Sequence, residues 1–203
     1  MKIAIIGTGN VGGSLATQWS RAGHHIHLGV RDIENFKGKE LLRNNRTSVH
    51  SIKEAVELSE AILVATPPQI SQSLLLDFGD TTGKVILDAT NSIRSKPQNH
   101  PTAYHVFEDL TKAEVVKCFN STGFENIKNP NYGSISLDMF MAGESGKAKE
   151  IATLLSQDAG FENCYDFGGG DRVELLEKFA LSWINLAIFQ RNGRDMGFKV
   201  VFR

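Results

Sequence analysis

Short apolar runs alternate with amphipathic segments along the whole chain. An apolar run from Ile3 to Ile6 gives way at Gly7 to a helical pattern that stops at Gly23, and alternation resumes over residues 24–30. Apolar runs typical of buried strands recur at residues 60–66, 84–88, 114–119, 135–142 and 163–167. Helical patterns separate several of them, at residues 70–78, 102–110 and 147–159. This regular alternation predicts a mostly parallel, doubly wound sheet.

Two capping patterns predict where further helices begin. Ser51 followed by Glu54 predicts a short helix, and Asp171 followed by Glu174 predicts the last long helix. Apolar residues of that last helix recur at three-and-four spacing: Leu176, Phe179, Ala180, Trp183, Ile184, Ala187 and Ile188. This broad stripe predicts a core contact whose outer edge meets a second copy of the chain. We interpret Trp183 as part of the stripe and not as a ligand-stacking residue.

These elements predict one α/β domain of Rossmann type over residues 1–203, with a C-terminal strand–helix extension and a final long helix. We expect the nucleotide half to span about residues 1–120, and an acceptor-site and dimerisation part to span about residues 121–203. Only one helix and a short tail follow the last predicted strand. The second substrate is therefore expected on the nucleotide domain itself, at the carboxyl ends of the strands.

The first strand runs directly into Gly7-x-Gly9-x-x-Gly12, and a helix follows at once. In dinucleotide-binding folds the first glycine of this fingerprint permits a tight turn, and the second lets the backbone approach the pyrophosphate. The third lets the helix pack closely on the strand, while the N-terminus of the helix attracts the phosphates. The complete order of strand, turn, helix and strand predicts dinucleotide binding.

The end of the second strand bears on the choice between NAD and NADP. Counting about twenty residues from Gly12 reaches Asp32, which favours NAD. The alternation of the strand instead puts Val30 at its tip and Arg31 as the next side chain out, which favours a 2′-phosphate and therefore NADP. Lys37 and Lys39 add positive charge nearby. The alternative is that Arg31 pairs on the surface with Asp32 or Glu34.

Composition narrows the possible partners. A formal net charge of −1 gives no general attraction to nucleic acid or anionic membranes, and no apolar run approaches the ~20 residues needed to span a bilayer. Because a strand begins at residue 2, we expect no signal peptide. Cys118 and Cys164 lack metal-ligand spacing and are interpreted as buried, reduced thiols, which favours the cytoplasm. We expect no metal site.

No general acid stands out. The available proton donors are His50, His100, His105, Tyr104, Tyr132 and Lys117, and none belongs to a recognisable acid–base constellation. His24, His25 and His27 lie at the start of the second strand, away from the expected chemistry. A carbonyl or imine substrate favours a positioned acid, whereas a conjugated ring acceptor can take its proton from solvent. The sequence therefore favours a flavin-like acceptor.

Seven short motifs follow one another along nearly the whole chain: GTGNVG at 7–12, GVRD at 29–32, VATPP at 64–68, LDATN at 87–91, VKCFNS at 116–121, MAG at 141–143 and GRD at 193–195. As an ordered set they resemble the NADP oxidoreductases that depend on the deazaflavin coenzyme F-420, and the related reductase domain of the STEAP metalloreductases. The resemblance implies NADP(H) as cofactor and F-420 or a flavin as second substrate.

The resemblance also implies roles for individual residues. Those assigned to the cofactor are Gly7, Thr8, Gly9, Asn10, Val11 and Gly12 at the pyrophosphate, Arg31 at the 2′-phosphate, Thr66, Pro67 and Pro68 flanking the ribose and pyrophosphate, and Asn91 at the nicotinamide. Those assigned to the meeting point of nicotinamide and acceptor are Asn91, Asn120, Ser121 and Thr122. The family often has Ser or Thr where Val30 stands, so one hydroxyl contact is missing. The alternative for the polar residues is turn formation, because Asn, Ser and Thr favour strand ends.

Three functions remain open from the sequence. The first is hydride transfer between NADP(H) and an F-420-like or flavin acceptor. The second is NADPH-dependent reduction of a small carbonyl or imine, and the third is a non-catalytic NADPH-sensing module. The crowding of polar residues around Asn91 and Asn120 favours an enzyme over a sensor.

Overall fold

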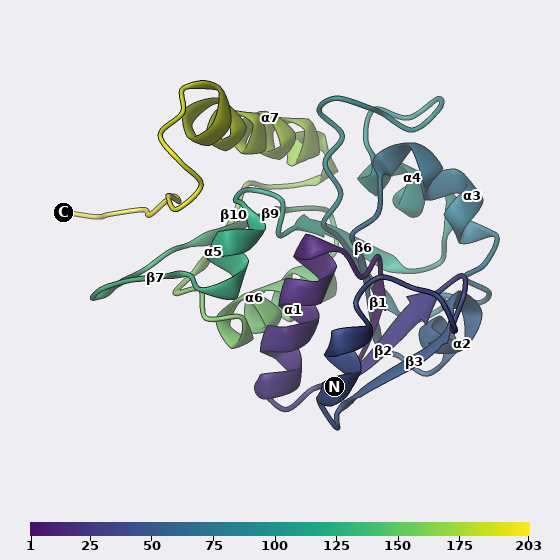
Figure 1. The fold of residues 1–203 in the computed structure, drawn as a ribbon. Coiled ribbons are helices and arrows are strands. Elements are labelled where there is room, and N and C mark those ends of the chain that lie inside the picture. The colour runs from purple at the N-terminus through teal and green to yellow at the C-terminus, as the bar shows by residue number, and fades with distance from the viewer.

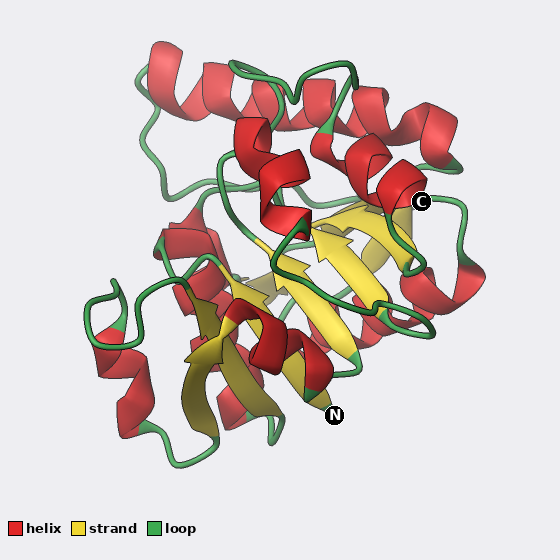
Figure 2. Ribbon diagram, turned by 90° about the vertical axis from the view of Figure 1, so that its right-hand side faces the viewer, coloured by secondary structure: helices red, strands yellow, loops and turns green.

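The structure is a computed structural model that describes residues 1–203, and its centre is one eight-stranded sheet (Figures 1 and 2). From one edge to the other, the strands are β10 (Cys164–Asp166), β9 (Met139–Ala142), β6 (Glu114–Cys118), β5 (Val85–Asp88), β4 (Ala61–Val64), β1 (Lys2–Ile6), β2 (His25–Val30) and β3 (Thr47–Ser51). Every neighbouring pair is parallel except β6 and β9. The order β3-β2-β1-β4-β5-β6 is that of a Rossmann fold, so the predicted fold class is confirmed.

Helices cover both faces of the sheet (Figure 2). One face packs against α1 (Asn10–Arg21), α5 (Phe124–Lys128) and α6 (Gly146–Asp158), through a core that includes Leu15, Trp19 and Leu155. The other face packs against α2 (Ile52–Glu57), α3 (Ser71–Leu75), α4 (Ala103–Leu110) and α7 (Val173–Ile184). Strand residues feed the two cores alternately: Ile3 and Ile5 enter one, Ala4 and Ile6 the other. A sheet buried on both faces explains why its strands read as nearly continuous apolar runs.

The predicted strand over residues 135–142 is wrong as one unit. Its first part, β8 (Ile135–Ser136), pairs with β7 (Asn131–Tyr132) in a separate hairpin whose turn contains Gly133 at a φ of +66°. Only Met139–Ala142 joins the main sheet. The interruption is at Asp138, whose carboxylate is buried and accepts hydrogen bonds from Asn163 Nδ2, Lys199 Nζ and the Val200 backbone N–H.

The two predicted capping boxes have different outcomes. The Ser51 hydroxyl accepts a hydrogen bond from the Glu54 backbone N–H, as predicted, and α2 begins there. The prediction for Asp171 is wrong. A 3₁₀ turn, Gly170–Arg172, precedes α7, and no side chain caps the helix at its start.

Three further findings concern the edge strand β3, the two thiols and the end of the last helix. β3 was not predicted because its sequence, TSVHS, is mostly polar and only half-buried at the sheet edge. Cys118 is buried as predicted, whereas Cys164 is only half-buried, and both thiols are free. The last helix continues beyond Ile184 as a π-helical turn, Asn185–Phe189. None of the helices combines the length and apolarity that a membrane crossing needs.

Candidate nucleotide and acceptor site

The turn after β1 depends on two glycines. Gly7 has a φ of +105°, and a Cβ there would lie 2.5 Å from the carbonyl oxygen of Ala65. A Cβ on Gly12 would lie 2.0 Å from the carbonyl oxygen of Gly7, so only glycine lets α1 approach the strand this closely. A Cβ on Gly9, in contrast, would meet no protein atom within 4 Å. The space above Gly9 is open to a ligand.

The N-terminus of α1 faces this open space without a cap. Gly9 precedes the helix, no side chain accepts from its first N–H groups, and its first turn contains no acidic residue. The positive end of the helix dipole and the free N–H groups therefore coincide at the glycine loop. Such an end binds phosphate oxygens without a charged side chain.

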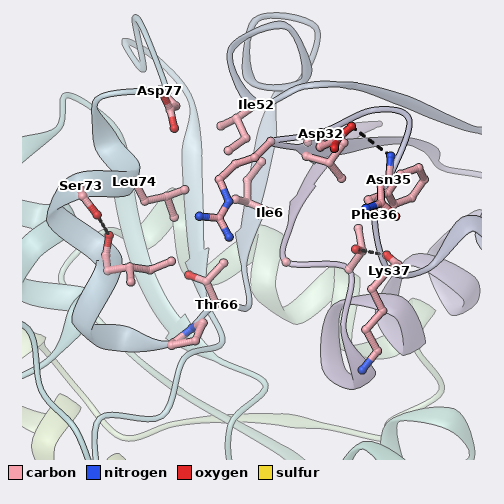
Figure 3. A pocket seen from close by; sticks show the side chains of 17 residues that line it. Ile6, Asp32, Asn35, Phe36, Lys37, Ile52, Thr66, Ser73, Leu74 and Asp77 are labelled. Carbon is pink, nitrogen blue, oxygen red and sulfur yellow. Dashed lines mark hydrogen bonds between the residues drawn. The ribbon is translucent and has the colours of Figure 1, made fainter.

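A cleft of about 810 Å³ lies beside the glycine loop, at the carboxyl ends of β1 and β2 (Figure 3). Of the predicted cofactor residues, Gly7, Thr8, Arg31, Thr66 and Pro67 line it. Gly9 and Asn10 border an adjoining hollow of about 390 Å³, which shares Thr8 and Lys37 with the cleft. Val11 and Pro68 line neither space: the Val11 side chain packs against the core, and Pro68 is buried.

Arg31 is exposed and forms no hydrogen bond or ion pair within the chain, so the predicted alternative of a pair with Asp32 or Glu34 is absent. Asp32 is engaged differently. One of its carboxylate oxygens accepts from the backbone N–H groups of Glu34 and Asn35, at 3.0 Å each, in a local turn. Figure 3 shows the bond from Asn35. The arginine is thus free for a ligand, whereas the aspartate already stabilises the loop that carries it.

The segment after Arg31 folds back over the glycine loop. The Thr8 hydroxyl donates a hydrogen bond to the Lys37 carbonyl, and Gly38 adopts a φ of +98° next to Thr8. This contact places the Lys37 side chain at the cleft. Lys39 instead donates to the Glu34 carbonyl and lies outside the cleft.

Three adjacent strands are each followed by a residue whose side-chain oxygen is buried and has no hydrogen-bond partner. These atoms are Thr66 Oγ1 after β4, Thr90 Oγ1 after β5 and Asn120 Oδ1 after β6, and they are three of only five such side-chain atoms in the chain. An unpartnered buried oxygen costs about 1–3 kcal/mol unless something binds it. Their position along one carboxyl edge, beyond the glycine loop, is where the nicotinamide half of a dinucleotide lies in this fold.

The other predicted acceptor residues have local partners. Asn91 is half-buried, and its side-chain oxygen accepts from the Ile93 backbone N–H. The Ser121 hydroxyl contacts Met139 Sδ at 3.4 Å, and Thr122 Oγ1 accepts from Asn126 Nδ2 at 2.7 Å. The Asn91 contact corresponds to the turn-forming alternative, and of the four residues only Asn120 has a buried polar atom without a partner.

Lys117 belongs to a buried ionic cluster that sequence reasoning missed. Its ammonium lies 3.1 Å from Asp88 at the end of β5 and 2.9 Å from Glu177 on α7, and it donates to the Thr90 carbonyl. Burial alone would lower the pKa of Lys117, but the charges of Asp88 and Glu177 raise it above its ordinary value. A lysine and an aspartate ending neighbouring apolar strands were the available signal, because buried charges need partners.

Each of the remaining candidate donors has a partner side chain. His50 pairs with Glu54, His100 with Asp109, His105 with Thr102, Tyr104 with Glu108 and Tyr132 with Asn126. His24 bridges the N-terminal amine and Asp158. No group of three or more His, Cys, Asp or Glu side chains is placed to hold a metal ion.

Comparisons with known proteins bear on this site. Residues 2–92 match the family model described as NADP oxidoreductase, coenzyme F420-dependent. Two relatives named F420-dependent NADP reductase, from Methanothermobacter marburgensis and Methanothermobacter thermautotrophicus, are 27% and 26% identical to the chain. Each comparison covers 98% of this chain, and 98% and 94% of the relatives.

Solved structures agree on the fold. A crystal structure from Arthrobacter sp. FB24, assigned provisionally as an F420-dependent NADP-reductase, superposes with a TM-score of 0.86 over all of both chains, at 24% identity. A reductive aminase from Aspergillus terreus in complex with NADPH4, cyclohexanone and allyl amine superposes with a TM-score of 0.66 at 18% identity. That superposition covers 91% of this chain but 59% of the aminase.

The resemblance read from the motifs is thereby confirmed. Residues 2–92 thus match the coenzyme F420-dependent NADP oxidoreductase family, and the chain as a whole is similar to the F420-dependent NADP reductases.

Proposed function

We propose that this protein is an NADP-dependent oxidoreductase that transfers a hydride between NADP(H) and a deazaflavin or flavin ring stacked on the nicotinamide. In this proposal the adenosine half of the cofactor occupies the cleft at β1 and β2, with Arg31 on its 2′-phosphate. The pyrophosphate lies at the N-terminus of α1, and the nicotinamide lies at the ends of β4, β5 and β6.

The observation that carries the proposal is the single continuous edge on which these features lie. The uncapped α1, the unpaired Arg31 and the three unpartnered oxygens all lie at the carboxyl ends of neighbouring parallel strands. Hydride transfer between stacked rings depends on alignment and exclusion of water, which can supply roughly 7–11 kcal/mol of the barrier. The cofactors carry the bond chemistry, so the protein needs only to hold the two rings together.

The comparisons support a ring acceptor on the same fold. The F420-dependent NADP reductases are matched over at least 94% of their length. The reductive aminase carries about two-fifths of its chain outside the match, since 59% of it is covered. The match to the F420-dependent NADP reductases is thus the more complete of the two.

The test is turnover with defined acceptors. Purified protein is mixed anaerobically with NADPH and, separately, with coenzyme F-420, FMN, FAD, a ketone and a cyclic imine, while the absorbance of NADPH and of the acceptor is followed. We expect stoichiometric oxidation of NADPH with a ring acceptor. Oxidation only with the ketone or imine would overturn the proposal.

The second candidate is a small-molecule imine or carbonyl reductase. Its support is the shared fold with the NADPH-bound reductive aminase and with imine reductases. Against it, each of the candidate proton donors His50, His100, His105, Tyr104 and Tyr132 already has a partner side chain. The sixth, Lys117, is enclosed in its ion pairs with Asp88 and Glu177. A non-catalytic NADPH sensor is the third candidate, and it predicts tight NADPH binding with no turnover with any acceptor.

We also propose a cytoplasmic homodimer. The supporting observations are two free thiols and the exposed outer edge of the last helical segment, with Leu181, Leu186, Ile188 and Phe189 between 38% and 51% exposed. Light scattering of the purified protein tests the dimer, and a mass of twice the 22.3 kDa of one chain is expected. Ile188→Glu should lower the measured mass to that of a single chain. A monomeric wild-type protein would overturn it.

A further inference from the structure

Asn120 has a side-chain orientation that its neighbour dictates. The residue is 8% exposed, and its amide nitrogen lies 3.3 Å from Glu177 Oε2. An ionised carboxylate can only accept hydrogen bonds, so the nitrogen of Asn120 must face Glu177. Its oxygen then faces elsewhere, and it has no partner in the chain.

Glu177 is itself held in place by two further donors. Its Oε1 accepts from Lys117 Nζ at 2.9 Å and from the Ser92 backbone N–H at 3.1 Å. Lys117 in turn is fixed by Asp88 at 3.1 Å. The carboxylate that orients Asn120 therefore lies on α7. It is bound to β6 through Lys117 and to the loop after β5 through Ser92.

The backbone just before Asn120 is strained. Phe119 adopts a φ of +69°, a conformation that a residue with a bulky side chain rarely occupies. Its ring is fully buried, with an edge-to-face contact to Trp19 at 5.5 Å between centroids. Strain of this kind persists where the surroundings determine the backbone closely, and here it sets the direction of Asn120.

We propose that Glu177 is a positioning residue, which holds the Asn120 carboxamide so that its oxygen accepts a hydrogen bond from the nicotinamide carboxamide N–H of the bound cofactor. The inference rests on the proposed function, because it assumes that the nicotinamide half reaches the ends of β5 and β6. A dinucleotide whose pyrophosphate lies at α1 places its nicotinamide on that side of the sheet. The nicotinamide carboxamide supplies the N–H donor that a free oxygen requires.

The experiment compares two ligands on the same protein. NADPH carries the nicotinamide, whereas 2′-phospho-ADP-ribose carries the same adenosine, 2′-phosphate and pyrophosphate without it. Glu177→Gln supplies an amide that donates to the Asn120 oxygen and occupies it. We expect NADPH to bind roughly 3- to 10-fold more weakly, as for loss of one net hydrogen bond, with the affinity of 2′-phospho-ADP-ribose unchanged.

Two further variants sharpen the test. Asn120→Ala should produce the same selective loss, and adding Glu177→Gln to it should produce no more, because Glu177 acts through Asn120. The matched control is Glu174→Gln, which should change the affinity of neither ligand. Glu174 lies one turn earlier on α7, in an exposed ion pair with Lys96 at 3.9 Å. If Glu177→Gln fails to fold, Glu177→Asp keeps the charge beside Lys117 but withdraws the carboxylate from Asn120.

The outcomes separate the two proposals. An unchanged ratio of NADPH to 2′-phospho-ADP-ribose affinity in both Glu177 variants overturns the positioning role and leaves the proposed function standing. Equal weakening of both ligands also overturns it, since Glu177 would then be merely structural. A wild-type protein that binds neither ligand overturns the proposed function itself.

Discussion

At the scale of single residues, we propose that Arg31 decides between the two forms of the cofactor. Its guanidinium is unpaired at the cleft, while the competing acidic residue, Asp32, already accepts two backbone N–H groups. A planar guanidinium can make two parallel charge-assisted hydrogen bonds to a phosphate. The 2′-phosphate of NADP is the group that distinguishes it from NAD at this position.

Arg31→Ala should weaken NADPH binding tenfold or more and leave NADH binding nearly unchanged. The reason is loss of a charge-assisted contact of about 1.5–3 kcal/mol. Isothermal titration with each cofactor measures it. Lys39→Ala is the control, because Lys39 lies outside the cleft. An equal loss for both cofactors would mean that Arg31 supports the fold and not the phosphate.

Two glycines in one loop should respond differently to the same added methyl group. Gly12→Ala brings a Cβ to 2.0 Å from the Gly7 carbonyl oxygen and should lower the free energy of unfolding by about 1–3 kcal/mol. Gly9→Ala meets no protein atom, so the protein should keep its stability and lose NADPH affinity. Urea unfolding and cofactor titration test the pair. Full cofactor affinity in Gly9→Ala would show that the pyrophosphate lies elsewhere.

At the scale of secondary-structure elements, the buried cluster of Lys117, Asp88 and Glu177 ties α7 to the ends of β5 and β6. An exposed ion pair contributes little to stability, whereas removal of one partner from a buried pair leaves an uncompensated charge. The helix therefore stays over the strand ends through electrostatics as well as through its apolar contacts at Val173 and Leu176.

Lys117→Met should lower the free energy of unfolding by about 3–5 kcal/mol, since two buried carboxylates then lose their cation. Lys53→Met removes an exposed i,i+4 pair with Glu57 at 3.9 Å and should change stability by no more than about 0.5 kcal/mol. Denaturant unfolding compares the two variants. Similar values for both would contradict the assignment of Lys117 to a buried ion pair.

The pair of edge strands β2 and β3 should be sensitive to acid. Burial, and to a smaller extent the neighbouring His50, lowers the pKa of His27. His27 Nδ1 lies 3.3 Å from His50 Nε2. The folded chain therefore binds a proton at His27 less readily than the unfolded chain. The contribution of neutral His27 to the free energy of unfolding should be fully present above its unfolded pKa of about 6.5. It should be lost as the pH falls below that value. Melting temperatures across this range should show a smaller fall in His27→Leu than in His25→Gln, and an equal fall would contradict the assignment.

At the scale of the whole molecule, periodicity predicted the architecture because a sheet buried on both faces demands apolar strands. The alternation of strands and helices predicted the mostly parallel sheet but not the order of its strands, and it missed β3, whose polar sequence resembles a loop. The break at Asp138 was not predictable from local pattern, because its partners Asn163, Lys199 and Val200 are distant in sequence.

The candidate site was predictable to a similar extent. The glycine loop and Arg31 follow from motif and register, since both depend on neighbours in sequence. Glu177 was missed because its partners, Lys117 and Asn120, lie about 60 residues away, and only the packing of α7 brings them together. Ser121 and Thr122 follow Asn120 directly in the sequence, but in the fold their hydroxyl groups contact Met139 and Asn126.

The most direct test of the central claim follows the hydride itself. NADPH deuterated at the reactive nicotinamide carbon is incubated with the protein and a deazaflavin, whose ring accepts hydride at a carbon and so retains the label. The two hydrogens on that nicotinamide carbon are labelled and tested separately. For one of the two labels, mass spectrometry of the reduced deazaflavin should show one deuterium per molecule. Bound NADPH that is never oxidised, or a reduced deazaflavin without deuterium from either position, would contradict the account.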